Sequence, residues 1–145
     1  MDKIIFLCTG NTCRSPMCVG FFKARGGEAR LGLEAESAGL FTSDGIPASE
    51  NAVIAARERG ADLSGHASRQ LTPELAAGAK YLVCMTGAQY DRLTEQYPQF
   101  ADKVFTLAPT DVSDPFGGSL TVYRHAAEQI DEAVGRLIEG LEKRV

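Results

Sequence analysis

The chain of 145 residues has no tryptophan, no long apolar run and no excess of basic residues. No stretch approaches the roughly 20 apolar residues that a membrane-spanning helix needs. The formal charge of −4 at pH 7 argues against a nucleic-acid or anionic-membrane partner, because both reward a basic surface. Internal repeats, low-complexity tracts and clear linkers are also missing. We therefore expect one globular domain over residues 1–145, with no nucleic-acid partner and no membrane partner.

The beginning of the chain, MDKIIF, lacks the features of a secretory signal peptide. Its apolar run is too short, and no small-residue cleavage site follows it. We therefore expect a cytoplasmic protein. The four cysteines are then catalytic or buried thiols rather than disulfides, because that compartment is reducing. Of the four, we expect Cys18 and Cys84 to be core residues.

Short apolar runs alternate with helical patterns along the chain. The predicted strands are 4–7, 33–38, 81–85 and 104–107, and the predicted helices are 16–25, 49–60, 72–77, 88–97 and 119–143. This alternation predicts an α/β fold with three α/β/α layers, in which helices cover both faces of a parallel sheet. Ligands bind such sheets beyond the carboxyl ends of the strands, and the first strand ends at Cys8.

The segment that follows this strand, CTGNTCRS at positions 8–15, has the composition of an anion-binding loop. It leads into a helix N-terminus, where backbone N–H groups converge and the helix dipole favours negative charge. Gly10 permits a tight turn, Asn11 tolerates the left-handed region, and Arg14 adds a planar fork that suits a phosphate group. The candidate substrate-binding residues are Thr9, Gly10, Asn11, Thr12, Cys13, Ser15 and Phe116. We also expect phosphate and other oxyanions to bind the loop as inhibitors.

Cys8 lies at the base of this loop, where the surrounding positive field favours its thiolate form. Ser15 can donate a hydrogen bond to the same sulfur. A thiolate that faces a bound phosphoryl group is a nucleophile, and the atom that departs opposite it needs a proton. Asp114 is our candidate for this acid, in a loop that Phe116 can extend as a pocket wall. Asp111 is the competing carboxylate, with a loop-capping role as its simpler interpretation.

Residues outside the loop are candidates for supporting it. We expect His66 to hold Asn11 and so the shape of the loop, and we place Ser37 and Arg69 in the same supporting set. Cys13 lies five residues after Cys8, and it has two interpretations. It is either a redox partner that forms a reversible disulfide with Cys8 or a packed spectator thiol.

These residues resemble the low-molecular-weight protein-tyrosine-phosphatase family over nearly the whole chain. The matching segments are CTGNTCRSPM at 8–17, SAG at 37–39, DLSGHASRQL at 62–71 and DPF at 114–116. The resemblance implies a four-stranded parallel sheet, Cys8 as the nucleophile, Arg14 on the phosphoryl oxygens and Asp114 as acid and then base. It also implies that no metal and no cofactor take part.

Three departures from the tyrosine-specific members are informative. Those members usually have an aliphatic residue in place of Thr12, an aromatic residue soon after the SAG segment, and tandem tyrosines after the late Asp-Pro. This chain has LFTS at 40–43 and FGG at 116–118. Thr12 together with DPFGGS at 114–119 resembles the protein-arginine-phosphatase branch. We therefore expect hydrolysis of phosphoarginine or phosphotyrosine in phosphorylated proteins through a cysteinyl-phosphate intermediate, with phosphoarginine slightly preferred.

Three alternatives use the same loop. The first is a classical low-molecular-weight protein-tyrosine phosphatase. The second is a thiol-dependent arsenate reductase, which relays a disulfide through two further cysteines near the third strand. Cys84 lies in that region, but no cysteine follows it. The third is a non-catalytic phosphate-binding or phospho-carrier module, which would need no acid at Asp114.

Overall fold

The computed structural model describes residues 1–144. Its strands β1 (Asp2–Cys8), β2 (Leu33–Gly39), β3 (Tyr81–Cys84) and β4 (Val104–Thr106) form one sheet in the order β2-β1-β3-β4. Every neighbouring pair in the sheet is parallel. The helices are α1 (Arg14–Ala24), α2 (Gly27–Leu31), α3 (Glu50–Glu58), α4 (Pro73–Ala77), α5 (Gly87–Gln96), the 3₁₀ helix η1 (Pro98–Lys103) and α6 (Leu120–Glu142).

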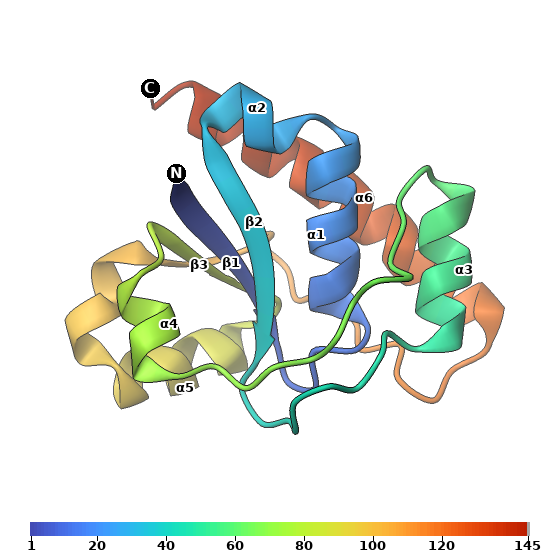
Figure 1. The fold of residues 1–145 in the computed structure, drawn as a ribbon, viewed down its shortest axis with the longest axis horizontal. Helices are drawn as coiled ribbons and strands as arrows, with labels where there is room; N and C mark the ends of the chain where they lie inside the picture. Colours follow the sequence, from blue (N-terminus) through green and yellow to red (C-terminus); the bar gives the residue numbers. More distant parts are fainter. Residues whose placement is uncertain (145) are drawn as a thin grey trace.

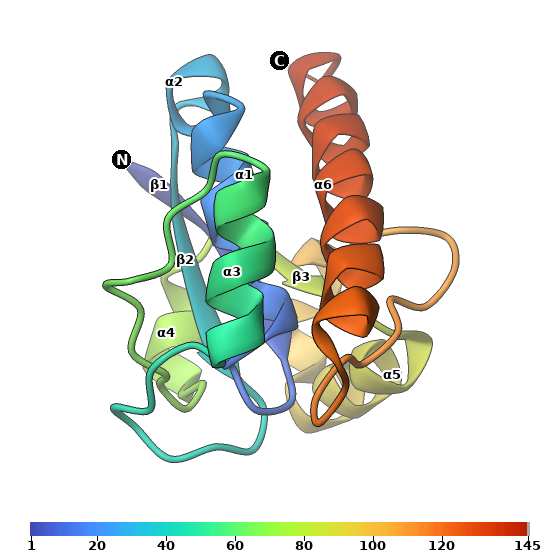
Figure 2. The same cartoon turned by 90° about the vertical axis from the view of Figure 1, so that its right-hand side faces the viewer.

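The sheet forms the middle of three layers, because successive side chains of a strand point to opposite faces. Ile4 and Phe6 of β1 pack into a large core with α1, α3 and α6. Ile5 and Leu7 pack into a second core with α4 and α5. Figure 1 shows these two groups of helices on opposite sides of the sheet, and Figure 2 shows α1, α3 and α6 side by side. The predicted three-layer α/β fold is confirmed.

β1 lies between β2 and β3, so the chain leaves its carboxyl end at the point where the strand order changes direction. Cys8 pairs with Gly39 of β2, and the preceding Leu7 pairs with Cys84 of β3. The loops that follow β1, β2 and β4 gather at this end of the sheet, away from both chain ends (Figure 1). Such a crossover point is where parallel sheets bind their ligands.

Two short elements were not predicted from the sequence. α2 has five residues and lies between Gly26 and Gly32, whose φ angles of 73° and 65° are in the left-handed region. One turn of helix is too short to show a hydrophobic period, and the glycines alone suggest a turn. η1 begins at Pro98, which ends α5 as expected and then starts a tighter helix. None of the helices within residues 1–144 is long and apolar enough to cross a membrane.

Candidate active site

The predicted anion loop connects β1 to α1 and encloses a pocket of about 200 Å³. Residues 8–14 line the pocket together with Asp114 and Phe116. The N-cap of α1 is Cys13, and its side chain makes no capping bond to the described part of the helix. The first N–H groups of α1 are therefore free to bind an anion, which the helix dipole also favours.

Cys8 is buried, with 3% of the residue exposed, and its sulfur has hydrogen-bond partners at the base of this pocket. The backbone N–H of Asn11 donates to it at 3.3 Å, and the hydroxyl of Ser15 lies 3.0 Å away. The side-chain amide of Asn11 donates to the Ser15 oxygen at 2.7 Å. Ser15 therefore keeps its own proton for the sulfur. Both groups can donate to Cys8, so the base of the pocket offers two hydrogen-bond donors to the sulfur.

Asn11 holds the shape of the loop from inside. It is fully buried, with φ 58° in the left-handed region that asparagine tolerates. Its side-chain oxygen accepts from the backbone N–H of Arg69 at 3.0 Å, and its carbonyl lies 2.6 Å from Nε2 of His66. Because a carbonyl only accepts, His66 donates from Nε2. Burial lowers the pKa of His66, so the neutral imidazole with its proton on Nε2 fills this role.

Arg14 connects the anion loop to the loop that follows β4. Its guanidinium donates from Nη1 to the carbonyl of Val112 at 3.0 Å, and the N–H of Val112 donates to the carbonyl of Met85 at 2.9 Å. The residue is 5% exposed. Nη2 lies 3.7 Å from the carboxylate of Asp114. A buried, fixed guanidinium beside the thiol gives the pocket a permanent positive charge for phosphoryl oxygens.

Asp114, rather than Asp111, lies at the pocket. Its carboxylate accepts from the backbone N–H of Phe116 at 3.1 Å, and 56% of the side chain is exposed. Asp111 instead accepts from the N–H of Gly87 at 2.9 Å, at the start of α5. The loop-capping interpretation of Asp111 agrees with this contact. Phe116 also lines the pocket, and the residue is 73% exposed.

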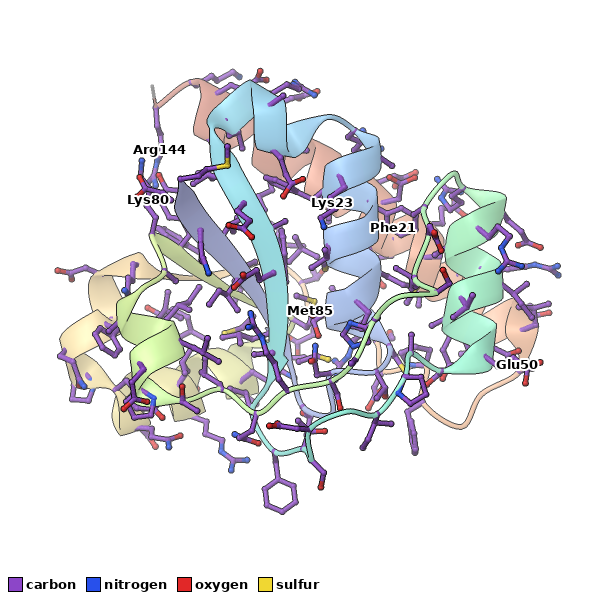
Figure 3. All side chains as sticks on the ribbon, viewed as in Figure 1. Phe21, Lys23, Glu50, Lys80, Met85 and Arg144 are labelled. Atoms are coloured by element: carbon purple, nitrogen blue, oxygen red, sulfur yellow. The ribbon has the colours of Figure 1, made fainter. Side chains whose placement is uncertain are left out.

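Ser37 and Arg69 lie behind the loop. The guanidinium of Arg69 donates to the carbonyl of Ser37 at 3.0 Å and to the carboxylate of Glu36 at 2.6 Å. Arg69 thus connects β2 to Asn11, whereas the Ser37 hydroxyl makes no hydrogen bond to residues 8–15 in the described chain. A role for Ser37 in bracing the loop stays a prediction. Figure 3 labels Met85, which directly follows β3, and Glu50, the first residue of α3.

Gly39, which follows Ser37 and Ala38, is required by close packing. A Cβ atom at this position would lie 2.7 Å from the Thr42 side chain and 2.9 Å from the Thr9 carbonyl. Glycine therefore lets the end of β2 touch the anion loop directly. Within residues 1–144, no three His, Cys, Asp or Glu side chains gather as metal ligands would.

Cys13 points away from solvent into a small polar cluster under the loop. Its sulfur lies 3.1 Å from the Ser49 hydroxyl and 3.2 Å from the Tyr123 hydroxyl. Burial is the largest cause that raises the pKa of Tyr123 to about 12, so the phenol is neutral and can donate to the sulfur. The N–H of Ser49 also donates to the carbonyl of Thr12 at 2.9 Å. The four cysteines are free thiols, and a disulfide between Cys13 and Cys8 stays a prediction.

Sequence reasoning missed Gln89, Ser49 and Tyr123 as neighbours of the site. Gln89 is buried on α5, where its side-chain oxygen accepts from the Met85 N–H at 2.9 Å and its amide donates to the Thr9 hydroxyl at 3.2 Å. A buried glutamine one turn after a strand is a signal of a needed polar contact, but its partner is visible only in the fold. Tyr123 belongs to the apolar stripe of α6, so the sequence pattern gives no sign that its hydroxyl contacts Cys13.

Comparison with known proteins places this geometry in a family. The model of the low molecular weight phosphotyrosine protein phosphatase family matches residues 3–145. A protein-arginine-phosphatase from Geobacillus stearothermophilus is 37% identical to this chain, over 97% of this chain and 96% of its own length. A protein-arginine-phosphatase from Bacillus subtilis (strain 168) is 38% identical, over 97% of both chains. The solved structure of the former, the YwlE arginine phosphatase, superposes with a TM-score of 0.91 at 36% identity, over 99% of this chain and 95% of that one.

A second solved structure bears on the covalent step. It is the structure of a mutant YwlE arginine phosphatase that carries a phosphorylated active-site serine. Its TM-score is 0.91 at 37% identity, over 97% of this chain and 96% of that one.

Proposed function

The chain belongs to the low molecular weight phosphotyrosine protein phosphatase family, and we propose that it hydrolyses phosphoarginine in proteins, with phosphotyrosine as its second substrate. The observation that carries the proposal is a fixed anion loop with a thiol at its base and a hydroxyl, Thr12, on its wall. The catalytic roles of Cys8, Arg14 and Asp114 are part of the proposal.

In the first step, the thiolate of Cys8 attacks phosphorus, and the bond from phosphorus to the guanidino nitrogen or phenolic oxygen breaks. The N–H groups of the loop and the guanidinium of Arg14 hold the three phosphoryl oxygens and stabilise the charge that they carry. Asp114 gives its proton to the departing atom. The product of this step is a cysteinyl phosphate and the free side chain of the substrate.

In the second step, Asp114 accepts a proton from a water molecule that attacks the same phosphorus. The sulfur–phosphorus bond breaks, which returns the thiolate and releases inorganic phosphate. The hydrogen bonds from Ser15 and the Asn11 N–H stabilise the departing thiolate, as they stabilise it before attack. The exposed carboxylate of Asp114 at the pocket edge has access to the water that this step needs.

The preference for phosphoarginine rests on the walls of the pocket. Thr12 brings a hydroxyl-bearing side chain to the lining of the pocket, where tyrosine-specific members of the family usually have an aliphatic residue. The carboxylate of Asp114 can accept from a guanidinium as well as protonate it. In the described chain one aromatic side chain, Phe116, lines the pocket, which is little surface for clamping a flat phenol ring. A site with polar groups for a substrate discriminates strongly against one that lacks the matching group.

The test compares kcat/KM for one peptide that carries either phosphoarginine or phosphotyrosine at the same position. We expect the ratio to favour phosphoarginine by about tenfold in the native protein. Thr12→Ile should lower this ratio by about tenfold, chiefly by loss of phosphoarginine turnover. An unchanged ratio in Thr12→Ile would remove the argument for phosphoarginine and leave tyrosine phosphatase as the function.

Phosphotyrosine stays a candidate because the ring of Phe116 is free at the mouth of the pocket, where a phenol can stack on it. The arsenate reductase alternative needs a chain of accessible thiols. Cys84 is fully buried, and burial raises its pKa to about 12, so it is a core residue and a poor relay. The free cysteines favour a reducing compartment, and we propose a cytoplasmic location on this ground.

A further inference from the structure

The catalytic pocket continues into a second hollow, which we name the flanking groove. The groove has a volume of about 510 Å³. Gly10, Thr12 and Phe116 line both the pocket and the groove, and residues 42 and 46–49 complete the wall of the groove. All of these residues are uncharged. A chain that leaves the pocket past Thr12 and Phe116 therefore meets an uncharged, largely apolar surface.

Two exposed large apolar side chains, Ile46 and Phe116, line this groove. Within residues 1–144, large apolar side chains are exposed at Met1, Phe41, Ile46, Phe116 and Val122. Apart from the first residue, these positions lie in the loop after β2, in the loop before α6 or in the first turn of α6. Figure 2 shows these segments gathered at the end of the molecule that carries the anion loop. Clusters of exposed apolar side chains mark surfaces that bind other molecules.

The wall of the groove is held in place on two sides. The N–H of Ser49 donates to the carbonyl of Thr12 at 2.9 Å, which joins the loop after β2 to the anion loop. The N–H of Ile46 donates to the hydroxyl of Ser68 at 2.9 Å, and the N–H of Ser68 donates back to the carbonyl of Ile46 at 2.7 Å. A surface fixed before binding loses little conformational freedom when a ligand arrives.

We propose that the flanking groove binds an apolar side chain of the protein substrate, within a few residues of the phosphorylated one. The inference rests on the proposed phosphatase function and adds a sequence preference to it. The groove shares Thr12 and Phe116 with the pocket, and an extended chain advances at most about 3.3–3.6 Å per residue, so the occupant is a near neighbour in sequence. Because the wall carries no charge, a leucine or phenylalanine fits it better than a charged or small polar residue.

The test uses peptides with one phosphorylated residue and either leucine or serine at each of the three positions on both sides. At one or more positions, leucine should raise kcat/KM about tenfold over serine, mainly through KM, as expected for one apolar contact in a substrate pocket. Ile46→Ser should reduce this preference to less than about threefold. Val122→Ser removes an exposed apolar side chain of the same face outside the groove, and it should keep the full preference.

Two further readouts separate the groove from the chemistry. Turnover of para-nitrophenyl phosphate, which does not reach the groove, should be the same in the native protein, Ile46→Ser and Val122→Ser. Titration of the same peptide pairs into Cys8→Ser measures the leucine preference without hydrolysis, so it tests the groove even if the proposed substrates fail. Equal binding and equal kcat/KM for leucine and serine at all positions would overturn the inference. So would a dimer in the native protein that Ile46→Ser converts to a monomer, because a second copy would then occupy the groove.

Discussion

The two ends of the sheet carry hollows of nearly the same size and different chemistry. The pocket at the carboxyl end has about 200 Å³, and a hollow at the amino end, between β3, β4 and α6, has about 230 Å³. The first is enclosed by consecutive residues of one loop whose N–H groups and Arg14 converge. The second is lined mainly by apolar side chains that include Tyr81, Phe105 and Leu137. Volume therefore does not distinguish a catalytic site in this molecule, whereas converging donors around a buried thiol do.

The arginine side chains at the two ends of the sheet also differ in their surroundings. Arg14 at the carboxyl end is fixed by a buried hydrogen bond and aims its charge into the pocket. Arg144 at the amino end lies over the ring of Phe105, 5.3 Å from its centroid, near the surface. Figure 3 shows Arg144 and Lys80 at the end of the molecule opposite the loops. A fixed, desolvated cation stabilises a phosphoryl group far more than a mobile, solvated one.

Cys8→Ser, at the carboxyl end of the sheet, should produce the largest loss of activity among these substitutions. Serine can accept the same hydrogen bonds, but its hydroxyl is a far weaker nucleophile than a thiolate, so kcat should fall by at least about 10³-fold. The measurement is para-nitrophenyl phosphate turnover, with circular dichroism to confirm that the fold is retained. Native activity in Cys8→Ser would mean that the chemistry lies elsewhere.

Asp114→Asn should have the next largest effect, because the variant keeps the shape of the loop but has no proton to transfer. We expect kcat for phosphoarginine peptides to fall by about 10²–10³-fold, with little change in KM. The first step on para-nitrophenyl phosphate should suffer less, since nitrophenolate departs without a proton. Asp111→Asn is the matched control and should stay within about twofold of the native rate. Equal losses in the two variants would contradict the assignment of the acid.

His66→Gln tests whether His66 supports the loop at the carboxyl end of the sheet, and the readout is the pH dependence of stability. Burial lowers the pKa of His66 in the fold, so the unfolded chain binds the proton more readily. The native state should therefore lose stability as the pH falls through the ordinary histidine pKa of about 6.5. Glutamine can donate the same hydrogen bond without titrating, so its free energy of unfolding in urea should fall less between pH 7.5 and 5.5. His125 is present in both proteins, so any contribution that it makes to the pH dependence is the same in each. Identical slopes would exclude His66 as the titrating group.

Phe105→Leu should produce the smallest effect. It alters the hollow at the amino end and removes the edge-to-face contact with Tyr81, whose ring centroid is 5.8 Å away. We expect a loss of roughly 1 kcal/mol in the free energy of unfolding and no change in kcat/KM beyond about twofold. A loss of activity without a loss of stability would show that the two ends of the sheet are coupled, and it would contradict the separation of their roles.

Most of the fold could be predicted because its signals are local. Residues 4–7 of β1 form an apolar run, as a strand covered on both faces requires, and α6 keeps a regular apolar stripe along its length. α2 was missed because a single turn between two glycines has no period to detect. The order of the strands was not predicted, since it depends on which surfaces pack together rather than on any one segment.

The residues of the site also fall into two groups: those that a local sequence pattern identifies and those that only the fold brings together. The segment from Cys8 to Ser15 is continuous in sequence, so its strand, turn and helix start identified the anion loop directly. Gln89 and Tyr123 meet it only after the chain has folded, and each looks like an ordinary helical residue on its own. The contact of His66 with Asn11 was expected from the place of His66 in the connection that leads to the third strand, and it is present in the structure.

The most direct measurement of the central claim is detection of the phosphoryl group on Cys8 itself. Asp114→Ala lacks the base for the second step, so para-nitrophenyl phosphate should give a burst of about one nitrophenol per protein, followed by slow turnover. Mass spectrometry of the quenched protein should then locate one phosphoryl group on Cys8. A variant that turns over with no burst and no adduct, or that carries the phosphoryl group on another residue, would contradict the account.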